Sequence, residues 1–304
     1  MKKLLLTLLL LTCIGLLSCT PKDARLTLMV PSGSPSLAVM HLLNDPDNYR
    51  VDIVNGSDPL LAAFASNSHD AIIAPTNLGA RLYQSGMDYV FAGTVSWGNL
   101  YLVMGGIGTI HLSELEDRSI VVFGQNQTSD IVLKYVLGAN GIVSRLTYVD
   151  SVATATAMFV ADQNLIVLTA EPSYSTLQSR VTNFASFDLQ AEYARLTGQE
   201  SYPQAGLFVR TGMKAAVRAA LISAVAASVD DVVLDIDTAS DLAVALGLGT
   251  SKAIMQSAIP NSRLRFVSAI DSKLALEAYF NVIMSFNPNL IGGALPADAF
   301  YYVP

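Results

Sequence analysis

Cys19 is the residue whose chemistry the sequence indicates most directly. It follows Leu16-Leu17-Ser18, and this run is preceded by Lys2, Lys3 and a mostly apolar segment. A basic start, an apolar segment and a small residue directly before a cysteine are typical of a bacterial lipobox. In such a sequence the thiol takes a diacylglycerol group, the chain is cut before the cysteine, and the new N-terminus is acylated, for example with palmitate. We therefore expect lipidation at Cys19.

The same segment predicts where the mature protein is held. Residues 1–18 would be a lipoprotein signal peptide, and residues 19–24 a lipidated tether. The alternative is a transmembrane anchor, but the apolar run over residues 4–17 is shorter than the roughly 20 residues that span a bilayer. We expect the protein to be anchored by lipid at the cell membrane or on its periplasmic face.

Six polar loops could bind a small molecule through hydroxyls, amides and free backbone N–H groups. Each follows a short apolar run and precedes the start of a helix or another strand, and most would lie at the carboxyl end of a strand, where open α/β sheets bind ligands. Some of the hydroxyls could equally be helix caps. The candidate ligand-binding residues in and beside these loops are Ser34, Asn55, Thr76, Asn77, Trp97, Asn99, Gln127, Thr128, Ser129, Glu171 and Tyr174.

Aromatic and acidic side chains add to this set. Trp97 is the only tryptophan, and its position at an inferred hinge suits a stacking wall for a ligand. Tyr101 and Tyr174 are weaker candidates of the same kind. Glu171 precedes Pro172, so it is either a favourable charge in the first turn of a helix or a carboxylate that faces the ligand.

The charge of the loops favours some ligands over others. None of the six loops contains Lys or Arg, whereas a strongly anionic ligand is normally held by a bidentate arginine. A neutral or cationic ligand with a flat, hydrogen-bonding ring is therefore favoured, for example a pyrimidine-type vitamin precursor. A sulfonate or nitrate held by helix N-termini alone stays open.

Several function classes lack their sequence signals. The chain has no Ser-x-x-Lys, no Gly-x-Ser-x-Gly, no paired Cys and His and no P-loop, and Gly105-Gly106-Ile107-Gly108 lacks the remaining spacing of a dinucleotide fingerprint. Its three histidines are far apart and outside metal-binding spacings. We expect no catalysis, no cofactor and no metal site.

Charge and cysteine content limit the partners and the source of stability. The formal net charge is −7, and loss of Lys2 and Lys3 with the signal peptide makes the mature chain more acidic. Without a cluster of Lys and Arg, nucleic acid is not expected as a partner. Because Cys13 leaves with the signal peptide and Cys19 is lipidated, stability must come from burial of apolar residues, which make up 52% of the chain.

Short apolar runs alternate with helix-length amphipathic runs, which predicts an α/β fold with mainly parallel sheets. A first unit has expected strands at 26–30, 51–54, 71–74 and 89–95, and a second unit of the same pattern begins near Gly105. After Tyr202-Pro203, an expected strand at 206–209 and a long helix at 213–229 return to the first unit. Two crossings between two units predict a hinge.

The ordered segments of the chain resemble a known family. The runs LMVPSGSPSLAVMHLL, DAIIAPTNLGARLYQSG, VSWGNLYLV, SELEDRSIVVFGQNQTSDIVLKYVL, LTAEPSYSTL, GLFVRTGM and IGGALPADAFYY are similar to those of ABC-importer substrate-binding lipoproteins that bind nitrate, sulfonate, taurine or thiamine-pyrimidine precursors. The resemblance covers residues 25–304. It implies a type II periplasmic-binding fold, in which two α/β lobes are joined by a two-segment hinge. Lobe I would comprise residues 25–98 and 207–304, and lobe II residues 99–206.

The resemblance also implies a function. We expect a monomeric, lipid-anchored receptor that captures a small polar molecule, heteroaromatic ones included, between its lobes and delivers it to an ABC permease with separate ATPase subunits. Two alternatives remain open at this point. One is an enzyme related to thiamine-pyrimidine synthase on the same fold, and the other is an envelope or host-binding lipoprotein that takes no part in transport.

Overall fold

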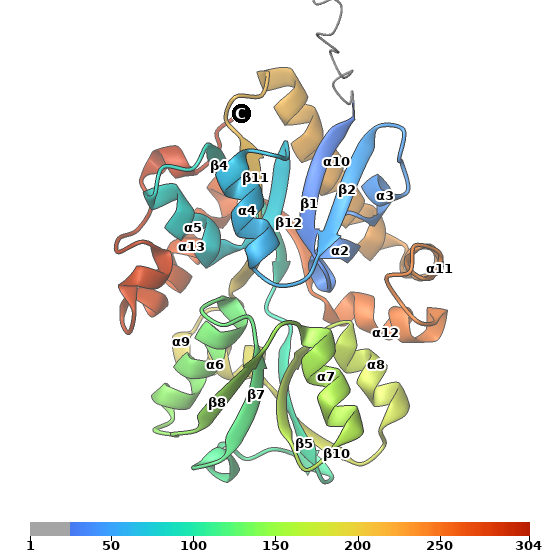
Figure 1. The fold of residues 1–304 in the computed structure, drawn as a ribbon, viewed down its shortest axis with the longest axis vertical. Coiled ribbons are helices and arrows are strands. Elements are labelled where there is room, and N and C mark those ends of the chain that lie inside the picture. Colours follow the sequence, from blue (N-terminus) through green and yellow to red (C-terminus); the bar gives the residue numbers. More distant parts are fainter. Residues whose placement is uncertain (1–24) are drawn as a thin grey trace, which may run out of the picture.

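The computed structural model describes residues 25–304, which form two α/β lobes separated by a waist (Figure 1). The expected signal peptide, the expected lipidation at Cys19 and the expected tether lie outside the described residues. Within residues 25–304, no helix combines the length and the apolar character that crossing a membrane requires.

Lobe I is built on a six-stranded mixed sheet in the order β12-β4-β11-β3-β1-β2. Strand β1 pairs in parallel with β2 and β3, whereas β11 runs antiparallel to β3 and β4, and β12 antiparallel to β4. The buried apolar run at the start of β3 suits an inner strand that is covered on both faces. The bounds are β1 (Leu26–Pro31), β2 (Tyr49–Val54), β3 (Ala71–Pro75), β4 (Tyr89–Trp97), β11 (Pro203–Arg210) and β12 (Leu264–Ser268).

Helices cover both faces of this sheet. On one face, Leu221, Val225 and Val229 of α10 pack in a core with Leu28 and Val30 of β1. The helices of lobe I are α2 (Ser34–Leu37), α3 (Met40–Leu43), α4 (Asp58–Ser66), α5 (Thr76–Gln84), α10 (Ala215–Leu234), α11 (Ile236–Ala245), α12 (Lys252–Asn261) and α13 (Ala269–Met284), followed by the short η2 (Pro288–Ile291) and η3 (Asp298–Phe300).

Lobe II repeats the plan with the strand order β6-β10-β5-β9-β7-β8. Strand β7 is parallel to β8 and β9, β6 is parallel to β10, and β5 runs antiparallel to both of its neighbours. The strands are β5 (Leu100–Gly105), β6 (Gly108–Thr109), β7 (Ser119–Phe123), β8 (Arg145–Val149), β9 (Ile166–Ala170) and β10 (Phe184–Asp188). The helices are η1 (Leu112–Leu115), α6 (Thr128–Ala139), α7 (Val152–Ala161), α8 (Ser173–Arg180) and α9 (Leu189–Thr197).

The structure confirms the predicted α/β class. Each lobe has one sheet, and both sheets contain parallel and antiparallel pairs. Parallel pairing occurs where a helix connects consecutive strands, as the alternating pattern predicts, and antiparallel pairing occurs chiefly around the strands at which the chain changes lobe. The chain leaves lobe I between β4 and β5 and returns before β11. Because β11 begins at Pro203, residues 203–206 belong to the sheet of lobe I, whereas the sequence placed them in lobe II.

A tyrosine cluster joins the cores of the two lobes. The ring of Tyr202 lies 4.9 Å from that of Tyr193 on α9 and 6.0 Å from that of Tyr279 on α13, measured between centroids. All three side chains are buried and belong to one apolar cluster with residues of both sheets. At this cluster, the two lobes are packed against each other through buried side chains.

Candidate functional site

A cavity of about 130 Å³ lies between the two lobes. Lobe I lines it with the ends of β1, β2 and β3 and the loops that follow them, and lobe II does the same with β7, β8 and β9. Gln204 and Ala205 of β11 complete the lining. These are the carboxyl ends of the parallel strands of both sheets, which is where open α/β sheets bind ligands.

Five of the residues predicted from the sequence meet at this cavity. From lobe I comes Ser34, at the start of α2. Gln127, Thr128 and Ser129 come from the start of α6, and Glu171 follows β9. Asn55 lies beside the lining residues Gly56 and Ser57, but its Oδ1 accepts a hydrogen bond from Ser32 Oγ at 2.6 Å.

Ser34 makes one of the direct contacts between the two lobes. Its Oγ donates to the backbone carbonyl of Glu171 at 2.9 Å and accepts from Asn99 Nδ2 at 2.8 Å. Gly33 has a φ of 104°, a conformation that favours glycine, and it brings the chain from β1 into the turn that carries Ser34. Asn99, which is 1% exposed, thus holds the Ser34 hydroxyl instead of lining the cavity itself.

The carboxylate of Glu171 is the most unusual charge at this site. The residue is 1% exposed, and its oxygens accept hydrogen bonds from Ser175 Oγ at 3.0 Å and Ser175 N at 3.2 Å. Burial raises the pKa of this carboxyl to about 7, although the two bonds from Ser175 oppose the shift. Among the described residues that line the cavity, none is Lys or Arg.

The start of α6 presents polar groups to the same cavity. Thr128 Oγ1 donates to the carbonyl of Gln204 at 3.3 Å, and Ser129 Oγ donates to the carbonyl of Phe123 at 2.7 Å, so both hydroxyls have partners within the protein. Gln127 is different, because its Oε1 is buried without a hydrogen-bond partner. It is therefore a polar atom that a bound molecule could satisfy.

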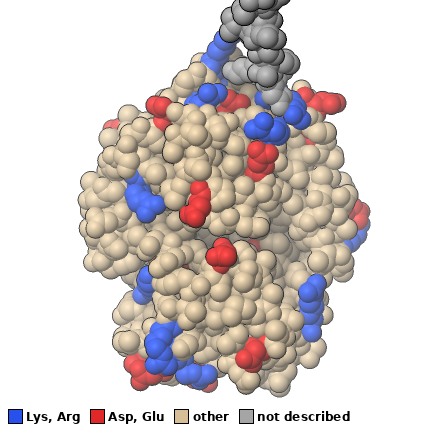
Figure 2. Space-filling model, viewed as in Figure 1, with Lys and Arg blue, Asp and Glu red and all other residues tan. Residues whose placement is uncertain are grey.

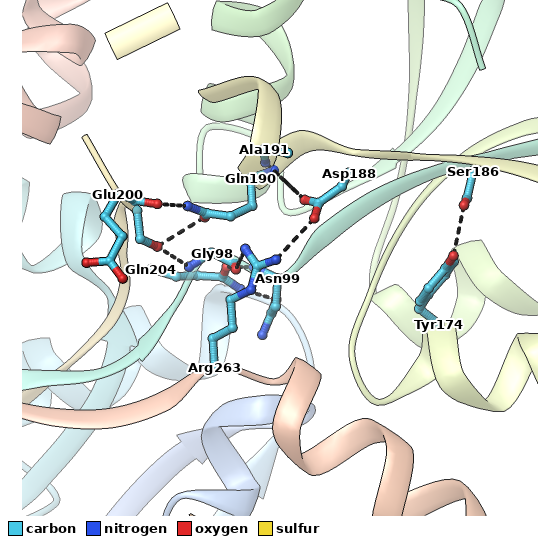
Figure 3. Close-up of polar contacts among 11 residues, drawn as sticks. Gly98, Asn99, Tyr174, Ser186, Asp188, Gln190, Ala191, Glu200, Gln204 and Arg263 are labelled. Carbon is cyan, nitrogen blue, oxygen red and sulfur yellow. Dashed lines mark hydrogen bonds and ion pairs between the residues drawn. The ribbon is translucent and has the colours of Figure 1, made fainter. Parts of the chain in front are cut away.

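The two crossing segments are held together on the hinge side of the waist (Figure 3). Arg263 Nη1 donates to the carbonyl of Gly98 at 2.9 Å, and its Nη2 lies 3.1 Å from Asp188 Oδ2 of lobe II. Gln204 and Asn99 exchange two bonds, one from Asn99 N to Gln204 Oε1 at 3.3 Å and one from Gln204 Nε2 to Asn99 Oδ1 at 3.1 Å. Hydrogen bonds therefore join the first crossing, at Gly98 and Asn99, to the second crossing at Gln204 and to Arg263.

Solved structures share this arrangement along nearly the whole chain. An ABC transporter from Parabacteroides distasonis is 24% identical with a TM-score of 0.77, and the match covers 92% of this chain and 99% of that chain. The periplasmic aliphatic sulphonate binding protein SsuA from Escherichia coli is 14% identical with a TM-score of 0.69, covering 92% of each chain. The zinc-bound ligand binding component of an ABC-type import system from Staphylococcus aureus is 13% identical, with a TM-score of 0.69 and coverage of 92% and 96%.

The chain has the periplasmic binding protein fold. A scan against protein-family models finds no match, and neither does a comparison with curated proteins.

Within this periplasmic binding protein fold, four predicted residues lie away from the cavity. Thr76 Oγ1 donates to the carbonyl of Pro203 at 2.7 Å, and Asn77 Nδ2 donates to the carbonyls of Asn126 and Leu290 at 3.0 and 3.3 Å. Tyr174 stacks on Tyr101 with centroids 4.1 Å apart, inside the core of lobe II. The fourth residue is Trp97.

Trp97 lines a second hollow of about 390 Å³ on the hinge side of the waist, together with Asp188 and Arg263. Its Nε1 donates to the carbonyl of Arg265 at 3.1 Å, and the guanidinium of Arg265 lies 4.6 Å from its ring centroid. One face of the ring is thus already covered. Trp97 is not among the residues that line the cavity between the lobes.

Sequence reasoning did not single out Phe123, Asp150 and Gln204, which also line the cavity. Phe123 is the last residue of β7, and Asp150 is the first residue after β8. Both occupy the strand-end position that identified the other candidates, so the same rule could have found them. Gln204 had no such signal, because its place depends on where the chain returns to lobe I.

Proposed function

We propose that the protein is an extracytoplasmic, lipid-anchored solute receptor of an ABC importer. It captures a small polar molecule, heteroaromatic ones included, between its lobes. The observation that carries this proposal is the cavity between the strand ends of both sheets, with Ser34 bonded to Glu171 across it. A molecule held there contacts both lobes at once, so its binding energy favours the closed arrangement over an open one.

The lining suits a small molecule with a flat ring and polar edges. Phe123, Leu60 and Val152 supply apolar contacts, and Gln127 and Glu171 supply hydrogen-bonding groups. Ligand sites of this kind are mostly apolar with few well-placed polar groups. The lipid at Cys19 keeps the receptor, as a monomer, near a membrane permease whose ATPase subunits are separate chains. No catalytic step is part of this proposal.

A thermal-shift screen of the full chain in detergent tests the proposal. The compounds are vitamins and their precursors, sulfonates and inorganic oxyanions. A compound at 100 times its Kd stabilises the folded state by about 2.7 kcal/mol, which corresponds to a rise in Tm of about 5 °C for a chain of this size. If a folded protein is stabilised by none of these compounds, the receptor proposal is contradicted.

A matched pair of variants locates the binding. Ser57 lines the cavity at the start of α4, and Ser66 ends the same helix outside it. Ser57→Trp should fill the cavity and abolish the shift caused by any binding compound. Ser66→Trp adds the same side chain to the far end of the helix and should leave the shift unchanged.

A further inference from the structure

The acidic character of the cavity goes beyond what a general receptor needs. Glu171 and Asp150 are its charged lining residues among the residues that the structure describes. The space-filling view shows an acidic and no basic side chain at the middle of the waist (Figure 2). Glu171 thus lines the cavity, and its two carboxyl oxygens accept hydrogen bonds from Ser175 without a cation among the lining residues.

A second acceptor points to the same type of ligand. Gln127 is 7% exposed, lines the cavity opposite the loops of lobe I, and leaves its Oε1 without a donor. Leaving a buried polar atom without a partner is unfavourable, so such atoms are expected to be satisfied by a water or a ligand. The carbonyl oxygen of Gln127 has no donor, and the carboxyl of Glu171 has donors from Ser175 but no opposite charge among the lining residues. The complementary molecule carries N–H groups.

We propose, on the basis of the receptor function above, that the cavity selects a ligand with a protonated amine or another cationic N–H group. That group pairs with the carboxylate of Glu171, and its N–H groups satisfy the unpartnered Oε1 of Gln127.

The surroundings of Glu171 explain why its carboxyl would hold a proton when no cation is bound in the cavity and release that proton when a cation binds. Burial raises the pKa of the carboxyl to about 7, and the groups packed around it do not include a cation that would reverse this. Two other titratable groups are relevant: Tyr101 on β5, whose pKa the charge of Glu171 helps to raise, and Asp150 after β8, which lines the same cavity. When a cation binds, the O–H bond of the carboxyl breaks and its proton goes to solvent. The ligand keeps its own proton, so one proton is released per cation bound.

This exchange makes the affinity depend on pH in a defined direction. Below pH 7 the ligand competes with a proton, and its affinity falls about 10-fold for each pH unit. Above pH 8 the carboxyl is already ionised, so binding releases almost no proton. Neutral or anionic ligands would not show either effect.

Isothermal titration calorimetry on the full chain in detergent tests this inference. The probes are matched sets of benzylamine, benzyl alcohol and benzoate, and of aminomethyl-, hydroxymethyl- and carboxy-pyrimidine. Each titration is run at pH 6.0 and 8.5, in two buffers whose ionisation enthalpies differ, so that proton release is measured directly. We expect benzylamine, which is still largely protonated at pH 8.5, to bind at least 10-fold more tightly than benzyl alcohol at that pH, and we expect both amines to release close to one proton at pH 6.0.

Two variants separate recognition from helix capping. Glu171→Gln removes the charge but keeps an oxygen that can accept from Ser175, and it should weaken amine binding by about 10- to 100-fold and abolish its pH dependence. Ser175→Ala removes the hydroxyl donor to Glu171 and keeps both the backbone N–H donor and the carboxyl, so amine binding should persist. If both variants lower Tm alike and neither changes amine binding, Glu171 is only a helix cap and the inference is wrong.

The other outcomes distinguish this inference from the receptor proposal. The inference alone fails if alcohols or carboxylates bind as well as the amines, or if amine binding releases no proton at pH 6.0. It also fails alone if no amine binds while other compounds of the screen stabilise the protein and Ser57→Trp abolishes that effect. Absence of any binding compound contradicts both proposals.

Discussion

The hydroxyl of Ser34 donates to the backbone carbonyl of Glu171 across the waist, at an oxygen-to-oxygen distance of 2.9 Å. Asn77 makes a second contact of this kind, because its Nδ2 donates to the carbonyl of Asn126 in lobe II at 3.0 Å. The lobes are therefore hydrogen-bonded to each other beside the cavity. This is the arrangement that a captured solute would stabilise.

Ser34→Ala should weaken solute binding without unfolding the protein. The variant removes the bond to the Glu171 carbonyl and the bond accepted from Asn99 Nδ2. Loss of the bond to Glu171 alone, at about 1 kcal/mol, raises Kd about 5-fold, so we expect an increase of at least this size, mainly through faster release. Stopped-flow release of a bound compound measures this. Ser36→Ala is the control, because Ser36 Oγ bonds to Gly33 within lobe I. An equal effect of both variants would contradict a role for the contact between the lobes.

Arg263→Gln should favour separation of the lobes. The guanidinium of Arg263 connects Gly98 with Asp188, and both ends of the ion pair are about one-third exposed, so the pair contributes at most about 1 kcal/mol. We expect a larger radius of gyration in small-angle X-ray scattering, with Tm nearly unchanged. Arg195→Gln breaks an ion pair with Glu192 inside lobe II and should leave the radius unchanged. An unchanged radius in Arg263→Gln would show that this ion pair does not hold the hinge.

Gly98→Ala should destabilise the fold because there is no room for a methyl group at the first crossing. A Cβ at this position would overlap Gln190 Oε1 and the ring of Tyr202. Overpacking of this kind costs about 1–3 kcal/mol. Gly138 of α6 has open space instead, and Gly138→Ala should stabilise the protein by about 0.5–1 kcal/mol. Urea unfolding measures both, and a neutral Gly98→Ala would mean that the crossing is loosely packed.

Glu171 should make the unfolding free energy depend on pH. Its pKa is about 7 in the folded protein against a usual value of 4.5, so between these values the folded state binds more protons than the unfolded state. Stability is therefore present at pH 4.5 and is lost as the pH rises through 7, by about 3 kcal/mol in total. Urea unfolding at pH 4.5, 6 and 8 should show this loss in the wild type relative to Glu171→Gln. A constant difference between the two proteins would contradict the prediction.

The local pattern of the sequence predicted the strand ends well. The buried run at the start of β3 and the polar turn after β7 are each legible within a few residues, and in parallel sheets such strand ends gather at one edge. Ser34, Gln127 and Glu171 were found in this way. The rule identifies the loop from the chain itself and does not require knowledge of distant partners.

The direction of a single side chain could not be predicted in the same way. Trp97 turns toward Arg265, which lies 168 residues later, and Thr76 turns toward Pro203, which lies 127 residues later. Both partners come from segments that return to lobe I after the whole of lobe II. A residue beside a hinge can face either side of the waist, and the choice is made by these returning strands.

Hydrogen–deuterium exchange tests the central claim most directly. The full chain is compared with and without the compound that gives the largest thermal shift. We predict slower exchange at the same time in the Ser32–Leu37 segment of lobe I and in the Gln127–Ile131 and Glu171–Ser175 segments of lobe II. Protection confined to one lobe, or to the hollow beside Trp97, would contradict capture of a solute between the lobes.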